Sequence, residues 1–432
     1  MKAIPKGYSL NEFPAMKEAL PLSLQHVLVL IFNVLPVPLL IGAGAGLSAS
    51  EITILVAGCM FVTGIATLIQ TIGVGPVGAR LPLPMENSFV FVAPGIALSA
   101  RYGLGSFTGA CLAGSIVTCM IWMAFHRQLQ SLFKPYIAGA VIMSLGLSLI
   151  GVGINYCAGG QGAADFGSAG NLFLALGTIL IMLLLNHYCS KNFLSKASPL
   201  IAIVAMSAVA AAFGKLDLSS VAGESWFRFP MLLHFGIKFE MGPVFTISVL
   251  SVIALVELMG DQSLAAALAK GEAPSSREIT GGILAQGVSS VVAALFNLCP
   301  TIAGCANIGL CSISGVMSRY VTALAGVIVL ICGFCPKLCA LFEAIPSAVI
   351  GGVVLSAFGS IVVSGMKVIL SEELTARTAT IVGVSLAVGI GFSVVPEAIA
   401  VLPLWASTLF SGVPGTAITA VVLSILLKEN TQ

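Results

Sequence analysis

The stretch Cys299–Tyr320 reads CPTIAGCANIGLCSISGVMSRY, and the rest of the chain is best interpreted outward from it. It lies among long apolar segments, yet it carries Pro300 near its start and glycines and polar side chains along its length. Helix breakers and amides at bilayer depth are tolerated only where the backbone faces protein or a water-filled cavity. We therefore expect a broken, half-spanning segment; the alternative is an irregular helix packed inside the bundle.

A second stretch, Leu81–Tyr102, has the same character, with the sequence LPLPMENSFVFVAPGIALSARY. Paired broken segments, one in each half of a membrane protein, are typical of a transporter's midplane binding site. We expect Ser88–Val92 and Ala303–Ile308 to be extended and to pair through their backbones, which hydrocarbon could not otherwise satisfy. Each would lead into a short helix, with Pro94 near the first start, and the free N–H groups there would carry a partial positive charge.

The composition is that of an integral membrane protein. Of the 432 residues, 58% are hydrophobic and 8% are charged, whereas soluble proteins carry roughly 25% charged residues. The net charge of +2, without basic runs interleaved with aromatics, indicates no nucleic-acid partner. Among eleven cysteines, the cluster Cys332, Cys335 and Cys339 lacks a fourth ligand in register and is interpreted as apolar filling. We expect no metal and no cofactor.

Apolar segments of about 20 residues predict an all-α membrane protein with fourteen transmembrane segments. The expected segments are 21–43, 49–70, 82–102 (broken), 105–126, 135–154, 170–189, 196–213, 243–268, 278–297, 300–318 (broken), 320–336, 344–366, 378–395 and 402–427. With a cytoplasmic N-terminus, this count places fourteen of the 19 Lys and Arg residues on the cytoplasmic side, as the positive-inside rule expects. Both termini would then lie in the cytoplasm, and the protein would be a multi-pass protein of the cytoplasmic membrane.

Each half holds seven segments with a broken third one, so the second half enters the membrane from the opposite face. The halves are therefore expected to be inverted repeats about an axis in the membrane plane. Between them, residues 214–242 are more charged and carry Trp226 and Phe227. We expect this connector to lie at the membrane interface, with its aromatic rings at headgroup depth.

Glu257 and Asp261 interrupt the eighth segment and, four residues apart, share one helix face. An acidic side chain inside a span costs at least ~2.5 kcal/mol and is by default a functional candidate. Two carboxylates this close do not both ionise easily in low dielectric, so one is expected to hold a proton near neutral pH, which suits proton-coupled transport. We expect Gly260 to let another backbone approach. The alternative is that the helix ends early and the acids face cytoplasmic water.

Other polar residues are weaker candidates. Gln25 and His26 open the first segment, with Asn33 further on, and His26 is a candidate for holding the site together. Glu86 is interpreted as a loop residue near the start of its span, with a position in the cavity as the alternative. Glu51 follows Ser48 in a capping box and needs no further role.

The sequence holds no Gly-x-Ser-x-Gly elbow, no Walker loop and no histidine pair at metal-ligand spacing. An enzyme is therefore a poor fit. Without a nucleotide-binding motif, a transporter of this composition would be a secondary one.

Four spaced motifs resemble the nucleobase–ascorbate transporter family, the group that includes the uracil and xanthine permeases. Ala306–Val321 is similar to the family signature: Asn307, Gly309 and Gly315 match, and Ser314 stands where the signature has Thr. Gln25–His26 resembles a Gln-His motif of the first segment, Ser88–Pro94 the third segment, and Glu257 with Asp261 the Glu-x-x-x-Asp of the eighth.

The resemblance implies a core domain that binds substrate and a gate domain that forms the scaffold and the dimer contact. The expected division is 1–20 cytoplasmic tail, 21–134 core domain, 135–213 gate domain, 214–242 interfacial connector, 243–336 core domain and 337–428 gate domain. Glu257 would hydrogen-bond a nucleobase, and backbone donors near Phe89, Asn307, Ile308 and Gly309 would complete the site. Asp261, Gln25, His26 and Ser314 would organise it or couple it to protons. Proton symport, an elevator-like slide of the core and a homodimer are further implications.

One departure from the family pattern concerns the substrate. The signature begins with Gln or Glu, sometimes Pro, but this chain has Ala306 there, which cannot hydrogen-bond a base through its side chain. Losing a partner relaxes a site's choice of ligand. The expected substrate is a purine or pyrimidine such as xanthine or uracil, with an unusual nucleobase or a compound that is not a nucleobase as the alternatives. Glu86 could act as a substitute partner. An anion transporter of the sulfate/bicarbonate type and a non-transporting sensor or scaffold remain the alternatives.

Overall fold

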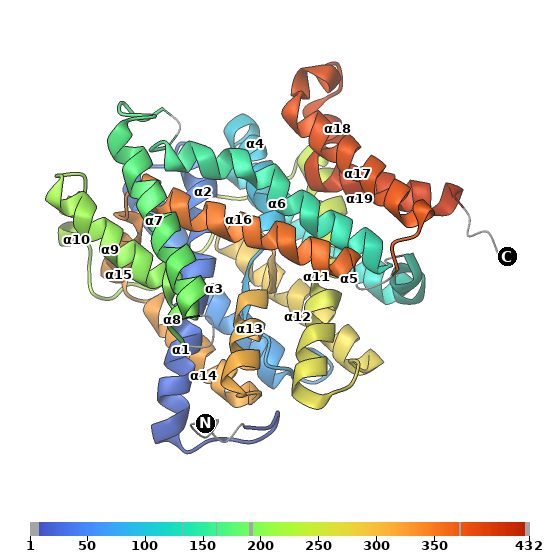
Figure 1. Cartoon of the computed structure of the whole chain (residues 1–432), viewed down its shortest axis with the longest axis horizontal. Coiled ribbons are helices and arrows are strands. Elements are labelled where there is room, and N and C mark those ends of the chain that lie inside the picture. The colour runs from blue at the N-terminus through green and yellow to red at the C-terminus, as the bar shows by residue number, and fades with distance from the viewer. Residues whose placement is uncertain (1–7, 133, 161, 190–192, 371–372, 428–432) are drawn as a thin grey trace.

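A computed structural model describes residues 8–132, 134–160, 162–189, 193–370 and 373–427, and the side chains of a few helical residues within these ranges, including Ala306 and Gly309, are not described. The described part of the chain is mostly helical and contains two short strands (Figure 1). The elements of the first half are α1 (Met16–Val34), α2 (Pro36–Gly44), α3 (Ala49–Ile72), β1 (Met85–Asn87), the 3-10 turn η1 (Phe89–Phe91), α4 (Val92–Tyr102), α5 (Leu104–Leu132), α6 (Pro135–Cys157), α7 (Ala169–Tyr188), α8 (Phe193–Lys196) and α9 (Ser198–Ala212).

The connector between the halves contains α10 (Ser219–Gly223). The elements of the second half are α11 (Met241–Lys270), α12 (Ser276–Leu295), β2 (Thr301–Ala303), α13 (Cys305–Ser314), α14 (Arg319–Cys332), α15 (Pro336–Glu343), α16 (Ser347–Ile369), α17 (Ala376–Val394), the 3-10 turn η2 (Pro396–Ile399), α18 (Leu404–Phe410) and α19 (Gly412–Leu426). Helices lie in every segment expected from the sequence. Within the expected tail, however, α1 already begins at Met16.

Local sequence signals explain where several helices begin and end. Glu51 accepts a hydrogen bond from the backbone N–H of Ser48 at 2.8 Å, which confirms the capping box at the start of α3. Pro36 begins α2 directly after α1, where its missing N–H breaks the first apolar segment into two helices. Gly315 ends α13 at a φ of 69°, a left-handed conformation that glycine adopts without a Cβ clash.

Among the described residues, nine helices are long and apolar enough to cross a membrane, or ten if the α14–α15 pair, bent by 90°, is counted as one span. Three shorter apolar helices lie at Phe89–Tyr102, Ser198–Ala212 and Gly412–Leu426. The protein is therefore a multi-pass membrane protein.

The two broken segments meet in the middle of the fold. Strands β1 and β2 pair antiparallel, with Met85 opposite Ala303, Glu86 opposite Ile302 and Asn87 opposite Thr301. Hydrogen bonds from the N–H of Gly304 to the carbonyl of Pro84 (2.8 Å) and from the N–H of Ser88 to the carbonyl of Pro300 (3.0 Å) extend the pairing at both ends. The predicted pairing of two short extended pieces is confirmed.

The predicted positions of these extended pieces were wrong by a few residues. Ser88–Val92 is not extended, because the hydroxyl of Ser88 accepts a hydrogen bond from the N–H of Val90 and starts η1, which runs into α4. Ala303–Ile308 is mostly helical, because α13 begins at Cys305. The capping side chain outweighed the strand preference of the β-branched and aromatic residues that follow it.

Helix packing joins the two halves throughout. Helix α3 packs on α14 and α5 packs on α12, while α1 packs on α14 and α11 packs on α5. Helices α6 and α16 lie side by side across the molecule (Figure 1) and form its most extensive helix contact. The hydrophobic core runs continuously from α1 to α19 around the paired strands.

Candidate functional site

The centre of the candidate site is the junction at which β1 leads into α4 and β2 leads into α13. Asn87, fully buried, donates from Nδ2 to the carbonyl of Cys299 at 2.6 Å and accepts the Cys59 thiol at 2.8 Å, so it ties β1 to the other broken segment and to α3. On the opposite strand, the hydroxyls of Ser289 and Thr301 lie 2.6 Å apart. These contacts fix both strands and therefore the starting points of both short helices.

The start of α13 carries Asn307 of the signature, and α1 supplies its partner. Nδ1 of His26 lies 3.0 Å from Oδ1 of Asn307, and Nε2 of His26 lies 4.0 Å from the thiol of Cys311. His26 is 2% exposed and Asn307 is fully buried. The Nδ2 group of Asn307 has no hydrogen-bond partner among the described residues, so a buried donor is left for a ligand or for water.

Helix α11 places its acidic face next to the same junction. It contacts β2, α13 and η1, and Glu257 is half-buried on it. The carboxylates of Glu86 and Asp261 both interact electrostatically with that of Glu257. Because α11 continues to Lys270, the alternative that this helix ends before the acids is wrong.

The expectation for Gly260 was wrong as well. A Cβ at Gly260 would meet no atom within 4 Å, so no other backbone approaches the helix there. Next to it, Oδ2 of the half-buried Asp261 has no hydrogen-bond partner among the described residues.

Glu86 was interpreted as a loop residue, and that interpretation was wrong. It is the middle residue of β1 and is 7% exposed. Pro82 and Pro84 suggested the start of a span, but the segment 81–84 is itself buried. The order of residues along the chain could not show that this segment enters the protein interior before the strand begins.

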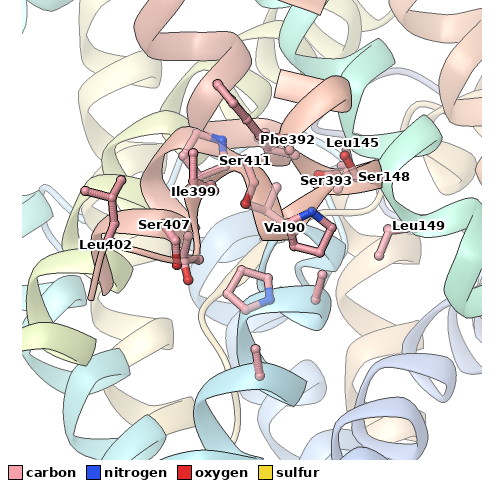
Figure 2. Close-up of a pocket in the computed structure, with 18 of the residues that line it drawn as sticks. Val90, Leu145, Ser148, Leu149, Phe392, Ser393, Ile399, Leu402, Ser407 and Ser411 are labelled. Atoms are coloured by element: carbon pink, nitrogen blue, oxygen red, sulfur yellow. The ribbon is translucent and has the colours of Figure 1, made fainter. Parts of the chain in front are cut away.

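A cavity of about 480 Å³ reaches the junction from the side of α4. Phe89, half-buried, lines it at the start of the short helix and makes an edge-to-face contact with Phe358 of α16, with ring centroids 5.7 Å apart. The remaining lining comes from α4, from α6 and from the part of the chain between α17 and α19 (Figure 2). Glu257, His26 and Asn307 do not line this cavity.

Sequence reasoning missed the hydroxyl groups of this cavity. Ser148 and Ser393 lie close together in it (Figure 2), and a Cβ placed on Gly412 would lie 3.2 Å and 3.3 Å from their hydroxyl oxygens. The buried Ser148 hydroxyl has no hydrogen-bond partner among the described residues. No sequence signal could have found these residues, because an isolated serine in a span usually bonds to its own helix.

The remaining predicted residues are less central. Ser314 lies about two turns beyond Asn307 on α13, and its hydroxyl bonds locally to the carbonyl of Cys311 and the N–H of Val316. Gln25 is half-buried on α1, and Ile308 is fully buried. The side chains of Ala306 and Gly309 lie outside the described residues. No group of three His, Cys, Asp or Glu side chains that could hold a metal ion occurs in the described part of the chain.

A sequence model described as the permease family, covering xanthine and uracil permeases, matches residues 17–398. The chain belongs to this xanthine/uracil permease family. The predicted resemblance is thereby confirmed, and since the related proteins are permeases, the protein is not an enzyme.

Curated relatives of this permease match along nearly their whole length. A putative purine permease of Clostridium perfringens is 33% identical over 414 residues, covering 94% of this chain and 90% of the relative. The uric acid permease PucJ of Bacillus subtilis is 33% identical over 417 residues, with 94% and 92% covered. The xanthine permease of Bacillus subtilis is 32% identical over 416 residues, with 95% and 93% covered.

Solved structures show that the fold of this permease is shared with anion transporters. The transmembrane domain of the cyanobacterial bicarbonate transporter BicA aligns with a TM-score of 0.62 at 15% identity, covering 96% of this chain and 99% of that domain. The murine solute carrier 26 family member A9, in an inward-facing state, aligns with a TM-score of 0.64 at 13% identity, covering 96% and 69%. At these identities the likeness concerns the fold alone.

Proposed function

We propose that this permease is a secondary active transporter that takes up a purine nucleobase, xanthine or uric acid, across the cytoplasmic membrane together with protons. The observation that carries the proposal is that α11, the helix that carries Glu257, contacts β2, η1 and α13, and that the carboxylate of Glu257 interacts electrostatically with that of Glu86 in β1. The relatives named xanthine permease and uric acid permease support the substrate class.

Binding would use groups of both broken segments. Glu257 would accept an N–H of the base, Phe89 would pack against its ring, and backbone N–H groups at Ala306, Asn307, Ile308 and Gly309 would donate to its carbonyl oxygens. N–H groups at the start of a helix carry a partial positive charge. That of Asn307 also donates to the carbonyl of Gly304 (3.2 Å), so it would share this bond with the ligand. His26 would fix the side chain of Asn307, with Gln25 beside it in α1, and Ser314 would close the far end of α13.

Proton coupling would reside in the acidic face of α11. Glu257 and Asp261 are half-buried on α11, and a membrane interior penalises unpaired charge. A proton that binds with the substrate would neutralise a carboxylate and make the loaded state easier to move. A proton would then neutralise the carboxylate charge, since the described residues offer no Lys or Arg as an ion-pair partner for either acid.

The contacts between helices support the proposal that fourteen segments form two inverted repeats. Exchanging each segment with its counterpart in the other half converts the α3–α14 contact into the α12–α5 contact, and the α1–α14 contact into the α11–α5 contact. The same exchange leaves the β1–β2 and α6–α16 contacts unchanged, because the two elements of each pair are counterparts of each other. A two-fold axis through the paired strands would produce this pattern.

An elevator-like movement fits the position of the cavity. The cavity separates α4 of the proposed core domain from α6 and α17–α19 of the proposed gate domain, so a slide between the two would open or close the path to Phe89.

The gate domain would form the contact of a homodimer. Both termini would lie in the cytoplasm.

Uptake into proteoliposomes tests this function. Radiolabelled xanthine, uric acid, uracil and sulfate are offered with an inward proton gradient, with and without a protonophore. We expect accumulation of one of the purines that the protonophore abolishes. Glu257→Gln should lower this uptake at least tenfold, whereas Glu51→Gln, an acid of a capping box, should leave it unchanged.

The alternatives give different results in the same assay. Uptake of sulfate but not of purines would indicate an anion transporter, which shares the fold but for which the three acids at the junction are unfavourable. Purine binding without accumulation would indicate a sensor. Purine uptake that continues in the presence of the protonophore would contradict proton coupling but would leave the proposed substrate class unaffected.

A further inference from the structure

Glu86 has an environment that the family pattern and the mechanism above do not explain. It is the middle residue of β1, where it pairs with Ile302 of β2, and it is 7% exposed. Its Oε2 atom is buried and has no hydrogen-bond partner among the described residues. Buried polar atoms are almost always hydrogen-bonded, so an unpartnered carboxylate oxygen at the centre of a transporter indicates a missing partner.

The charged and polar groups around Glu86 do not neutralise it. Asn33 of α1 hydrogen-bonds its carboxylate, and Glu257 repels it. Asp261 lies on the same face as Glu257 and interacts with both acids. None of the ion pairs between described residues includes Glu86. The missing partner must therefore supply hydrogen-bond donors.

The position of Glu86 connects it with the signature. It is paired with Ile302 in register, and a Cβ placed on Gly304 would lie 2.8 Å from its Oε2 atom. Gly304 comes two residues before Ala306 in the sequence. The carboxylate of Glu86 thus reaches the start of α13, where the signature has a Gln or Glu side chain and this chain has the methyl group of alanine.

We propose that Glu86 is a substrate-binding carboxylate that replaces, from the opposite strand, the hydrogen-bonding side chain absent at Ala306. Together with Glu257 it gives the site two acceptors on different elements. The ligand would be an oxidised purine whose six-membered ring carries N–H donors next to carbonyl acceptors, as in xanthine and uric acid, rather than adenine, whose nitrogens in that ring are acceptors only. This inference rests on the proposed function, because it specifies the substrate of the same site.

A second, fully buried group supports a ligand at this place. The Nδ2 group of Asn307 is an unpartnered donor in the first turn of α13, the helix that begins just after Gly304. One unpartnered acceptor and one unpartnered donor near the same helix start match the alternating N–H and C=O groups of an oxidised purine.

Binding measurements on purified protein test the inference. Xanthine, each of its singly N-methylated forms and adenine are titrated against wild type, Glu86→Gln, Glu86→Gly and the double variant Glu86→Gly/Ala306→Gln. Glu86→Gln keeps an acceptor oxygen but loses the charge, and should weaken xanthine binding about tenfold, because hydrogen bonds to charged groups are roughly twice as strong as those between neutral groups. The double variant should recover at least part of the affinity lost in Glu86→Gly, because it returns a polar side chain to position 306.

The methylated ligands separate a binding role from a structural one. If Glu86 accepts a purine N–H, one methylated xanthine should bind wild type more weakly than xanthine, and this difference should disappear in Glu86→Gly. A merely structural residue would weaken all ligands alike. Gel filtration and thermal unfolding check that each variant is folded.

Several outcomes would overturn the inference. Glu86→Gln binding xanthine within about threefold of wild type would do so, as would equal weakening of every ligand or no recovery in the double variant. If wild type binds no purine at all, the proposed function fails instead. If wild type binds xanthine and only the Glu86 variants behave unexpectedly, the function stands and this inference fails.

Discussion

Asn297 shows how much one side chain can hold together in this fold. Its Nδ2 group donates to the hydroxyl of Thr108 (3.0 Å) and the carbonyl of Gly236 (2.9 Å), and its Oδ1 accepts from the N–H of Phe235 (3.2 Å). It thereby ties the turn before β2 to α5 and to the connector. Its φ of 59° is a left-handed conformation, which asparagine tolerates better than most residues.

Two substitutions at Asn297 separate the backbone from the hydrogen bonds. Asn297→Ala should destabilise the protein by about 2–4 kcal/mol, because it leaves buried partners unsatisfied and forces alanine into the left-handed region. Asn297→Gly should cost about 1 kcal/mol less, since glycine adopts that conformation freely. Thermal unfolding in detergent measures both.

Asn155→Ala is the matched control, because the side chain of Asn155 makes no hydrogen bond in the described part of the chain. This variant should unfold at the same temperature as the wild type. Equal instability of the alanine and glycine variants would show that the backbone conformation contributes nothing.

Glu257 and His26 could be named as candidate site residues from the sequence, because acids inside spans are rare and costly and because amides lie near His26. Their roles stay predictions. Burial of Glu86 could not be predicted, because it depends on the second strand far along the chain. Asn297 gave no signal, since its partners come from two other segments, α5 and the connector.

At the scale of elements, glycines set how closely helices pack. A Cβ on Gly146 of α6 would lie 2.7 Å from the carbonyl oxygen of Phe358 in α16, and one on Gly139 would lie 2.7 Å from the carbonyl oxygen of Gly365. Small residues of this kind let helix backbones approach in a membrane, where packing replaces the hydrophobic effect as the driving force.

Substitution of Gly146 should therefore separate α6 from α16. Gly146→Leu is expected to destabilise the protein by at least about 1–3 kcal/mol, because overpacking forces both backbones apart. Gly151→Leu on the same helix is the control, since a Cβ there would meet nothing within 4 Å. Fluorescence-detected gel filtration after heating compares the two, and equal melting would contradict close packing as the reason for these glycines.

The existence of the helices and of the two broken segments followed from hydrophobic segments, prolines and glycines. Their exact boundaries did not. The strands lie before the residues with the highest strand preference, because Ser88 starts a 3-10 turn and Gly304 precedes α13. Local capping decided these ends, while pairing with a distant partner decided which residues became strand.

At the scale of the molecule, the distribution of basic residues predicts that residue 272 faces the cytoplasm and the connector faces outward. Glu272 and Gly223 are both exposed. Gly223→Cys should react with a membrane-impermeant maleimide in intact cells, above the labelling of the parent protein. Glu272→Cys should react only after the membrane is permeabilised. The reverse pattern would contradict the predicted orientation, and labelling of both in intact cells would contradict an odd number of crossings between them.

The pairing of β1 with β2 has a consequence for how the protein is made. The first strand ends at Asn87 and its partner begins only at Thr301, so the ribosome completes the whole first half, the connector, α11 and α12 before the second strand exists. Until then the N–H and C=O groups of β1 have no partner, and lipid cannot supply one. The nascent chain must therefore keep Leu81–Val92 out of contact with lipid until the second broken segment arrives, and membrane insertion of the two halves becomes a single coordinated event.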